Sequence, residues 1–234
     1  MKIGVIGGNG VAATNRLCDM IERKVTAAGA FRDAHHPEMI VWQATSVPSR
    51  SMFLEGRGPD WRPDYVNIAK QFKALGCDIG CMCCNTAHYA VDEIAVKSGL
   101  RFINLLEEVA RQVNYMKLRK VMMFCSDGAR KFDIYGSVFH RVCPSCELVY
   151  PPESDQALVT KVICGVKTKE RFNLEPEKQL RDLVARAGFP VVLGCTDLRV
   201  ALPAESPLYD NVAVDSLECL ADAIIGCFKK GNKQ

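Results

Sequence analysis

The sequence predicts an α/β protein in which parallel β-sheets are flanked by helices. Short apolar runs of strand length alternate with amphipathic stretches of helix length along all 234 residues. Hydrophobic residues make up 48% of the chain and charged residues 24%, which is ordinary globular composition. Because parallel neighbours need a crossover between them, this alternation favours parallel over antiparallel sheets.

The first half of the chain contains three expected strands and three expected helices. The apolar runs KIGVIG, MIVWQAT and DIGCMCC predict strands at 2–7, 39–45 and 78–84. Apolar residues at helical spacing predict helices at 13–28, 65–75 and 85–99, each followed by a glycine that can end it. The residues from 46 to 63 are polar and rich in Gly and Pro, which predicts a loop.

The pattern then restarts in the second half. Strands are expected at 102–106, 120–125, 146–151, 191–195 and 212–217, and helices at 107–113, 159–167 and 175–187. The run KVMMFC resembles KIGVIG in position, since it precedes SDG as the first run precedes GNG. The chain is therefore expected to contain two similar halves.

A comparison of the two halves in register strengthens this prediction. Asn104 follows Cys84 by 20 residues, and Asp215 follows Cys195 by 20 residues. The segments that begin there, NLLEEVA and DSLECLA, match in polarity and both open a helix. We therefore expect two pseudo-symmetric lobes, each presenting one cysteine after a central strand.

The expected lobe 1 comprises residues 1–101 plus 208–234 and carries Cys84; the expected lobe 2 comprises residues 102–207 and carries Cys195. Ligands of open α/β sheets bind at the carboxyl ends of the strands. The two cysteines are therefore predicted to face each other across an active-site cleft between the lobes.

The composition gives no reason to expect a nucleic-acid-binding, secreted or membrane-spanning protein. The net charge of +3, with basic and acidic residues interspersed, gives no reason to expect nucleic-acid binding. No secretory signal and no membrane-spanning run is expected, because the apolar runs are only strand-sized. Twelve cysteines without such a signal indicate free thiols in a reducing cytoplasm.

Two other site types are weaker interpretations. Gly8, Gly10 and Ala13 fit a dinucleotide-binding turn, but the second strand ends without the acidic residue that would hold the ribose. A zinc site would need spaced ligand pairs on turns, whereas Cys81, Cys83 and Cys84 alternate faces along a strand. CPSC at 143–146 with His140 offers only half of such a site. No metal and no cofactor is predicted.

The settings of two cysteines favour catalysis. Cys84 is expected to end its strand just before Asn85 and Thr86, which are residue types that cap helices. Cys195 is likewise followed by Thr196. A thiol at a helix N-terminus is favoured as the thiolate. The pair is therefore predicted to act as acid and base on opposite faces of a substrate carbon.

The segments GVIGGNGVAAT, CNTAH and GCTDL, in this order, resemble the cofactor-independent aspartate/glutamate racemase superfamily, and most closely its aspartate racemase branch. The resemblance implies a two-lobed enzyme, a homodimer, that inverts the α-carbon of an amino acid with two cysteines and without pyridoxal phosphate. It implies L-/D-aspartate as the substrate. Glutamate or another amino acid, and a related isomerase or decarboxylase reaction, remain as alternatives.

The resemblance also assigns substrate-binding residues. Arg50 matches the arginine that grips the side-chain carboxylate, and Lys167 matches the family's lysine. Asn85, Thr86 and Thr196 match residues that hold the α-carboxylate and α-amino groups, and Asn9 stands in the turn after the first strand. The Asp-Ser pair of the glutamate racemase branch is replaced there by glycine and Asn9. We expect His88 to be structural, because no acid near it in the sequence would orient it.

Overall fold

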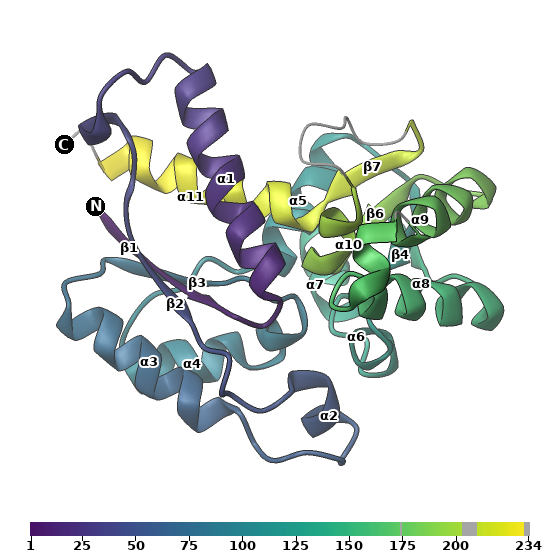
Figure 1. Ribbon diagram of the computed structural model, residues 1–234, viewed down its shortest axis with the longest axis horizontal. Coiled ribbons are helices and arrows are strands. Elements are labelled where there is room, and N and C mark those ends of the chain that lie inside the picture. Colours follow the sequence, from purple (N-terminus) through teal and green to yellow (C-terminus); the bar gives the residue numbers. More distant parts are fainter. Residues whose placement is uncertain (174, 203–209, 232–234) are drawn as a thin grey trace.

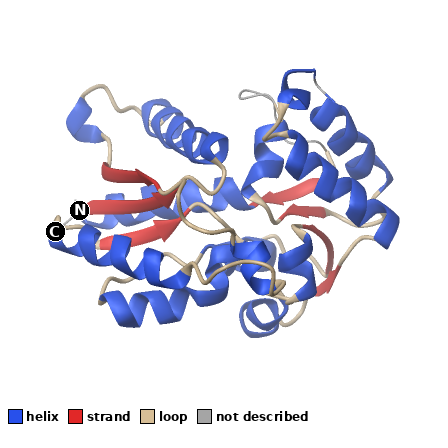
Figure 2. Cartoon of the chain, turned by 60° about the horizontal axis from the view of Figure 1, so that its bottom comes forward, coloured by secondary structure: helices blue, strands red, loops and turns tan. Residues whose placement is uncertain are grey.

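The two predicted parallel sheets are present in the computed structural model, which describes residues 1–173, 175–202 and 210–231. The first sheet has the strand order β2-β1-β3, with β1 at Lys2–Gly7, β2 at Glu38–Gln43 and β3 at Ile79–Met82. The second has the order β5-β4-β6-β7, formed by β4 (Lys120–Phe124), β5 (Glu147–Val149), β6 (Val191–Leu193) and β7 (Val212–Asp215). Figure 2 shows the two sheets apart, each surrounded by helices. The predicted fold class is confirmed.

Helices cover both faces of the first sheet because the side chains of β1 alternate. Ile3 and Val5 point toward α1 (Val11–Ala27), which buries an apolar stripe on that face. Ile6 points toward α3 (Arg62–Ala74) and α4 (Val91–Ser98) on the other face. Gly4 lets the ring of Phe72 lie against the strand, since a Cβ there would lie 2.3 Å from Phe72 Cδ2. The strands β1 and β3 are thus buried between helices, whereas the edge strand β2 is largely exposed, with Val41 and Trp42 both 36% exposed.

The second sheet is covered in the same way. On one face lie α8 (Glu153–Gly165), α9 (Glu175–Arg186) and α10 (Thr196–Ala201), packed against Phe124 and Leu193. On the other lie α5 (Leu105–Tyr115) and α7 (Gly136–Val142), packed against Val121 and Met123. This second set shares one continuous apolar core with α1, which joins the two lobes.

The C-terminal segment crosses between the lobes. β7 pairs in parallel with β6, with Val192 opposite Val214, so Val212–Asp215 belongs to the second sheet. The helix that follows, α11 (Ser216–Gly231), returns to pack against α1 and α5, as Figure 1 shows. We expected all of 208–234 to belong to lobe 1. This is wrong for β7, which belongs to the second sheet, whereas α11 packs against α1 of lobe 1. The expected boundary at 207/208 lies outside the described residues.

Several elements differ from the sequence prediction. The expected loop at 46–63 contains a short helix, α2 (Arg50–Leu54), whose N-terminus is capped by the side chain of Ser49. The expected strand at 102–106 is reduced to one bridge, between Phe102 and Gly80. The expected helix at 85–99 begins as a 3-10 turn, η2 (Thr86–Ala90), before α4.

The remaining short elements lie at the edges: α6 (Asp127–Lys131), η1 (Asp33–His35) and η3 (Lys169–Asn173). Among the described residues, no helix combines the length and the apolar character needed to cross a membrane.

Candidate active site

The structure brings the two predicted cysteine segments together. Cys84 lies two residues beyond β3, and Cys195 lies two residues beyond β6, each half-buried at the carboxyl end of its sheet. The hydroxyl of Thr196 donates a hydrogen bond to the carbonyl of Cys83 at 3.5 Å, which ties the two segments to each other. Burial and the charge of Asp197 are the main causes that raise the pKa of Cys195, and the charge of Cys84 adds a smaller contribution. The two thiols are therefore close enough to interact electrostatically.

Cys195 is not favoured as a thiolate, contrary to expectation. Burial raises the pKa of the Cys195 thiol far above its ordinary value, and the carboxylate of Asp197 raises it further. The nearby cation of Lys167 lowers the pKa but does not offset these two effects. Thr196 does not cap α10, which has only six residues, because its hydroxyl is bonded to lobe 1.

The backbone of Cys84 is fixed by a hydrogen bond from the imidazole of His88. The Nδ1–H of His88 donates to the carbonyl of Cys84 at 2.9 Å, a bond that spans one turn of chain. Burial lowers the pKa of His88 to about 4, so the imidazole is neutral at neutral pH. These contacts fit the predicted structural role of His88, which fixes the backbone at Cys84.

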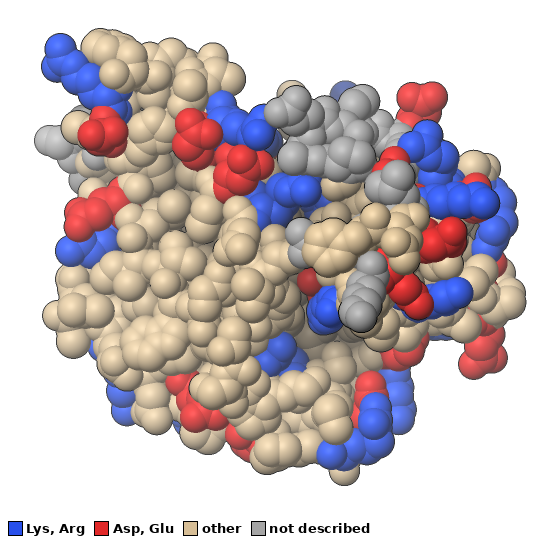
Figure 3. Space-filling view, viewed as in Figure 1, with Lys and Arg blue, Asp and Glu red and all other residues tan. Residues whose placement is uncertain are grey.

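A cavity of about 870 Å³ opens between the lobes, and we call it the inter-lobe cavity. Among the described residues, its lining includes Asp197 but neither Cys84 nor Cys195. Its charged and amide side chains are Asn9, Asn15, Arg16, Asp19 and Arg50 from lobe 1, and Lys167 and Asp197 from lobe 2. Figure 3 shows basic side chains in the hollow near the centre of this face. The positive φ of Gly8, 82°, lets the β1–α1 turn approach the backbone of Ala44 at the edge of this cavity.

The two predicted cationic residues both line the inter-lobe cavity but differ in their partners. Arg50 donates from Nη1 to the carbonyls of Pro48 at 2.8 Å and Val47 at 3.4 Å, which fixes its guanidinium. Its buried Nε has no hydrogen-bond partner. Lys167 instead forms an ion pair, with Nζ 2.9 Å from Oδ2 of Asp197. Arg50 thus retains a donor for an anionic ligand.

Asp197 is a site residue that the sequence analysis missed. Its side chain is buried, with the residue only 3% exposed, and it lines the inter-lobe cavity. Burial raises the pKa of its carboxyl group, while Lys167 and Arg50 lower it. Oδ1 has no hydrogen-bond partner. The acidic residue of GCTDL was the available signal, but it was given no role.

Asn85 and Thr86 are engaged in contacts between the lobes. Asn85 Nδ2 donates to Ser216 Oγ at 3.1 Å, and its Oδ1 accepts a hydrogen bond from the hydroxyl of Tyr135. Thr86 Oγ1 lies 3.2 Å from Ser126 Oγ. The prediction that Asn85 caps the following helix is wrong, because its side chain makes no capping bond.

Asn9 is oriented by a buried tyrosine. Its Nδ2 donates to the hydroxyl of Tyr65, which packs against Trp61 in the core of lobe 1. Its Oδ1 is buried and has no hydrogen-bond partner. Asn9, which lines the inter-lobe cavity, therefore has a fixed side-chain amide with one unpaired, buried acceptor.

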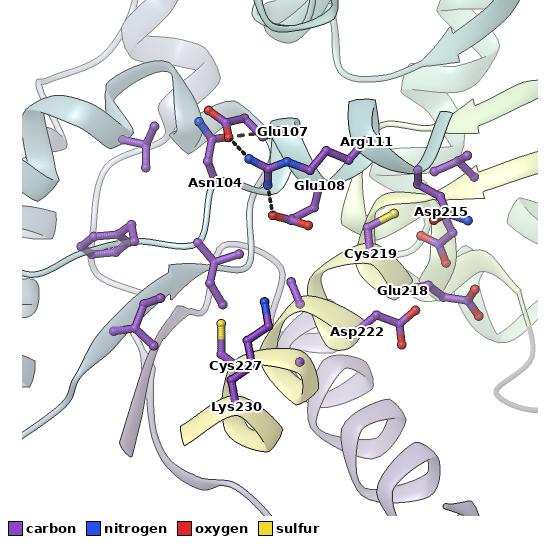
Figure 4. Close-up of a pocket in the computed structure, with 18 of the residues that line it drawn as sticks. Asn104, Glu107, Glu108, Arg111, Asp215, Glu218, Cys219, Asp222, Cys227 and Lys230 are labelled. Atoms are coloured by element: carbon purple, nitrogen blue, oxygen red, sulfur yellow. Dashed lines mark hydrogen bonds and ion pairs between the residues drawn. The ribbon is translucent and has the colours of Figure 1, made fainter. Parts of the chain in front are cut away.

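The other cysteines do not form a comparable site. A second cavity, of about 650 Å³, lies between α5 and α11 and contains Cys219 and Cys227 (Figure 4). Both belong to one helix, so they cannot reach opposite faces of a substrate carbon. Glu107 and Glu108, which line it, are paired with Arg111. Among the described residues, no group of three or more His, Cys, Asp and Glu side chains is placed to hold a metal ion.

Comparisons with known proteins show the family of the chain and agree with its fold. Residues 3–224 match the protein family described as Asp/Glu/Hydantoin racemase. The fold is similar to that of Picrophilus torridus aspartate racemase, with a TM-score of 0.79 and 24% identity over 97% of this chain and 93% of that one. It is also similar to an aspartate racemase homologue from Pyrococcus horikoshii, with a TM-score of 0.71 and 21% identity over 97% and 98% of the two chains. The broad specificity amino-acid racemase RacX of Bacillus subtilis is 22% identical over 97% of both chains.

Proposed function

The chain belongs to the Asp/Glu/hydantoin racemase family and is an isomerase of the racemase type, and from that premise we propose that it interconverts the L and D forms of an acidic amino acid, foremost aspartate, by a two-cysteine mechanism without pyridoxal phosphate. The observation that carries this proposal is the placement of Cys84 and Cys195. They follow the matching strands β3 and β6 of the two lobes, and the hydroxyl of Thr196, next to Cys195, donates to the carbonyl of Cys83, next to Cys84.

In this mechanism the two thiols exchange roles. Cys84 as thiolate takes the proton from Cα, and Cys195 as thiol delivers its proton to the opposite face. The product enantiomer has then formed, Cys84 carries a proton and Cys195 is the thiolate. The opposite enantiomer reacts from this second state, and for another turnover in the same direction Cys84 gives its proton to water and Cys195 takes one from water. The raised pKa of Cys195 keeps its proton in place at neutral pH, which suits the donor.

The substrate carboxylates need hydrogen-bond donors. Backbone N–H groups that follow Cys84 and Cys195 would hold the α-carboxylate and the charge that develops on it, together with the hydroxyls of Thr86 and Thr196. Arg50 would bind the distal carboxylate, because a guanidinium can donate to both carboxylate oxygens and its Nε is free of other bonds. Lys167, which is already paired with Asp197, would contribute only a smaller part of the attraction.

A second candidate is a racemase that accepts several amino acids. The inter-lobe cavity continues past Arg50 to Asn15 and Asp19 on α1, and its volume of about 870 Å³ exceeds what aspartate would fill. This observation favours longer side chains as additional substrates. In either case we expect a homodimer in a reducing compartment, which sedimentation of the purified protein would test for the oligomeric state.

A panel of single L- and D-amino acids, incubated with the protein without added cofactor and separated by chiral chromatography, distinguishes the candidates. The proposal predicts that aspartate is interconverted fastest. Interconversion of several unrelated amino acids at similar rates would favour the second candidate, and no interconversion of any of them would contradict both.

A further inference from the structure

We propose that Asp197 and Asn9 form the site that binds the α-ammonium group of the substrate, with Oδ1 of each side chain as an acceptor. This inference rests on the proposed function and adds an assignment of the substrate amine. It concerns two residues of different lobes, since Asn9 follows β1 and Asp197 lies in the first turn of α10.

The first observation is the free oxygen of Asp197. One carboxylate oxygen, Oδ2, is paired with Lys167 at 2.9 Å, while Oδ1 is buried without a hydrogen-bond partner. Burial of a charged oxygen without a donor is costly, because the group loses its hydration. A ligand that donates a hydrogen bond at this point would remove that cost.

The second observation is the position of Oδ1. A Cβ on Gly10 would lie 2.3 Å from it, so the carboxylate sits directly against the β1–α1 turn. Asn9 is the preceding residue of that turn, and its own Oδ1 is also buried and free of partners. Two unpartnered acceptors of opposite lobes therefore flank one glycine in the wall of the inter-lobe cavity. An ammonium group, which carries three donors, matches such a pair.

The third observation is the charge distribution around the inter-lobe cavity. Its lining contains three cationic residues, Arg16, Arg50 and Lys167, which suit carboxylates rather than an amine. It contains two carboxylates. Asp19 is paired with Arg23 at 2.8 Å and is only partly buried, which leaves Asp197 as the buried anion of the described lining.

Binding of the ammonium at Asp197 would also affect the neighbouring thiol. The negative charge of Asp197 is one of the causes that raise the pKa of Cys195. An ammonium bound to Asp197 offsets this charge, so the Cys195 thiolate formed during turnover is less disfavoured when substrate is present. The amine of the substrate would thus assist the acid–base step as well as orient Cα.

The test compares amino acids with analogues that lack only the α-amine. L-Aspartate is paired with succinate, L-glutamate with glutarate, and L-lysine with 6-aminohexanoate. Equilibrium binding is measured by calorimetry in a Cys84→Ala/Cys195→Ala background, which removes turnover, with and without Asp197→Asn. The control variant is Asp19→Asn, which removes the other carboxylate of the inter-lobe cavity.

The proposal predicts that Asp197→Asn weakens binding of the preferred amino acid about 10- to 100-fold, the loss expected for a charge-assisted hydrogen bond, and leaves its des-amino analogue unchanged or bound more tightly. Asp19→Asn should leave both unchanged. Gly10→Ala should give the same selective loss, because its methyl group would displace Oδ1.

An equal change in both members of each pair would overturn the assignment, since Asp197 would then act only through Lys167. This outcome leaves the proposed function intact. Selective loss of amine binding in a protein whose wild-type form racemises none of these amino acids would contradict the proposed function and support the ammonium site. If no amino acid bound the Cys84→Ala/Cys195→Ala protein, both would be wrong.

Discussion

Lys167 and Asp197 form an ion pair in the wall of the inter-lobe cavity, with Nζ of the lysine 2.9 Å from Oδ2 of the aspartate. Burial, the largest single effect, lowers the pKa of Lys167, but the charge and the hydrogen bond of Asp197, together with the nearby thiols, raise it by more, so the net shift is upward and the lysine stays protonated. The pair leaves little net charge for a substrate carboxylate. We therefore expect Arg50, whose Nε has no hydrogen-bond partner, to be the stronger carboxylate ligand.

Replacement of these two cations should therefore have unequal effects. Arg50→Met should raise KM for aspartate on the order of 100-fold, because it removes a charge-assisted contact to the distal carboxylate. Lys167→Met should raise it on the order of 10-fold, since Lys167 is already neutralised. Steady-state kinetics measure both, with Arg57→Met, an exposed arginine paired with Glu55, as the control. A larger effect at Lys167 than at Arg50 would contradict this order.

Replacement of either proposed acid–base cysteine should abolish racemisation. Cys84→Ala and Cys195→Ala should each lower kcat on the order of 10³-fold, as expected when a general acid or base is removed. Cys164→Ala, which changes an exposed cysteine on α8, should retain full activity. Chiral chromatography of the product measures the rates. Substantial activity in either of the first two variants would exclude the two-base mechanism.

The buried His88 should make stability depend on pH. Its pKa is about 4 in the folded protein and about 6.5 when unfolded, so the unfolded chain binds more protons between these values. Stability should therefore fall as pH drops from about 6.5 to 4, by roughly 3 kcal/mol. Denaturant unfolding of His88→Gln, compared with wild type, should lack this part of the loss.

The exposed His140 provides the matched control for this experiment. His140→Gln should show the same pH dependence as wild type. An identical loss in wild type and His88→Gln would mean that other groups cause it.

Two glycine substitutions should change stability in opposite directions. Gly4→Ala would place a Cβ 2.3 Å from the ring of Phe72, and overpacking of this kind costs about 1–3 kcal/mol. Gly226→Ala, within α11, meets no atom within 4 Å and should stabilise the protein by up to about 1 kcal/mol through higher helix propensity. Urea unfolding measures both, and destabilisation by Gly226→Ala would contradict the packing described.

The elements with strong periodicity could be predicted from the sequence. The strands at 2–7 and 120–125 and the helix α1 were found because their apolar pattern is local. The end of β3 was placed two residues late: the register with β1 ends at Met82, opposite Ile6, although the N–H of Cys83 still donates to the carbonyl of Ile6. The end of a strand depends on its pairing with a neighbouring strand, and the local sequence of residues 78–84 gives no information about that pairing.

The candidate site could be predicted only in part, because local motifs are visible in the sequence but contacts between distant residues are not. Local motifs indicated Cys84 and Cys195, but the charge state expected for Cys195 was wrong because burial depends on the whole fold. Asp197 was missed because its role depends on the contact of its Oδ1 with Gly10, and Gly10 is distant in the sequence and belongs to the other lobe. The capping role of Asn85 was wrong because Tyr135 and Ser216 occupy its amide.

The most direct test of the two-base proposal is the reaction of the purified protein with L-aspartate in heavy water, followed by mass spectrometry and chiral chromatography. The proposal predicts that D-aspartate appears without added cofactor and that it carries deuterium at Cα, because the delivered proton comes from a thiol that exchanges with solvent. Absence of D-aspartate, or D-aspartate that retains the original hydrogen at Cα, would contradict it.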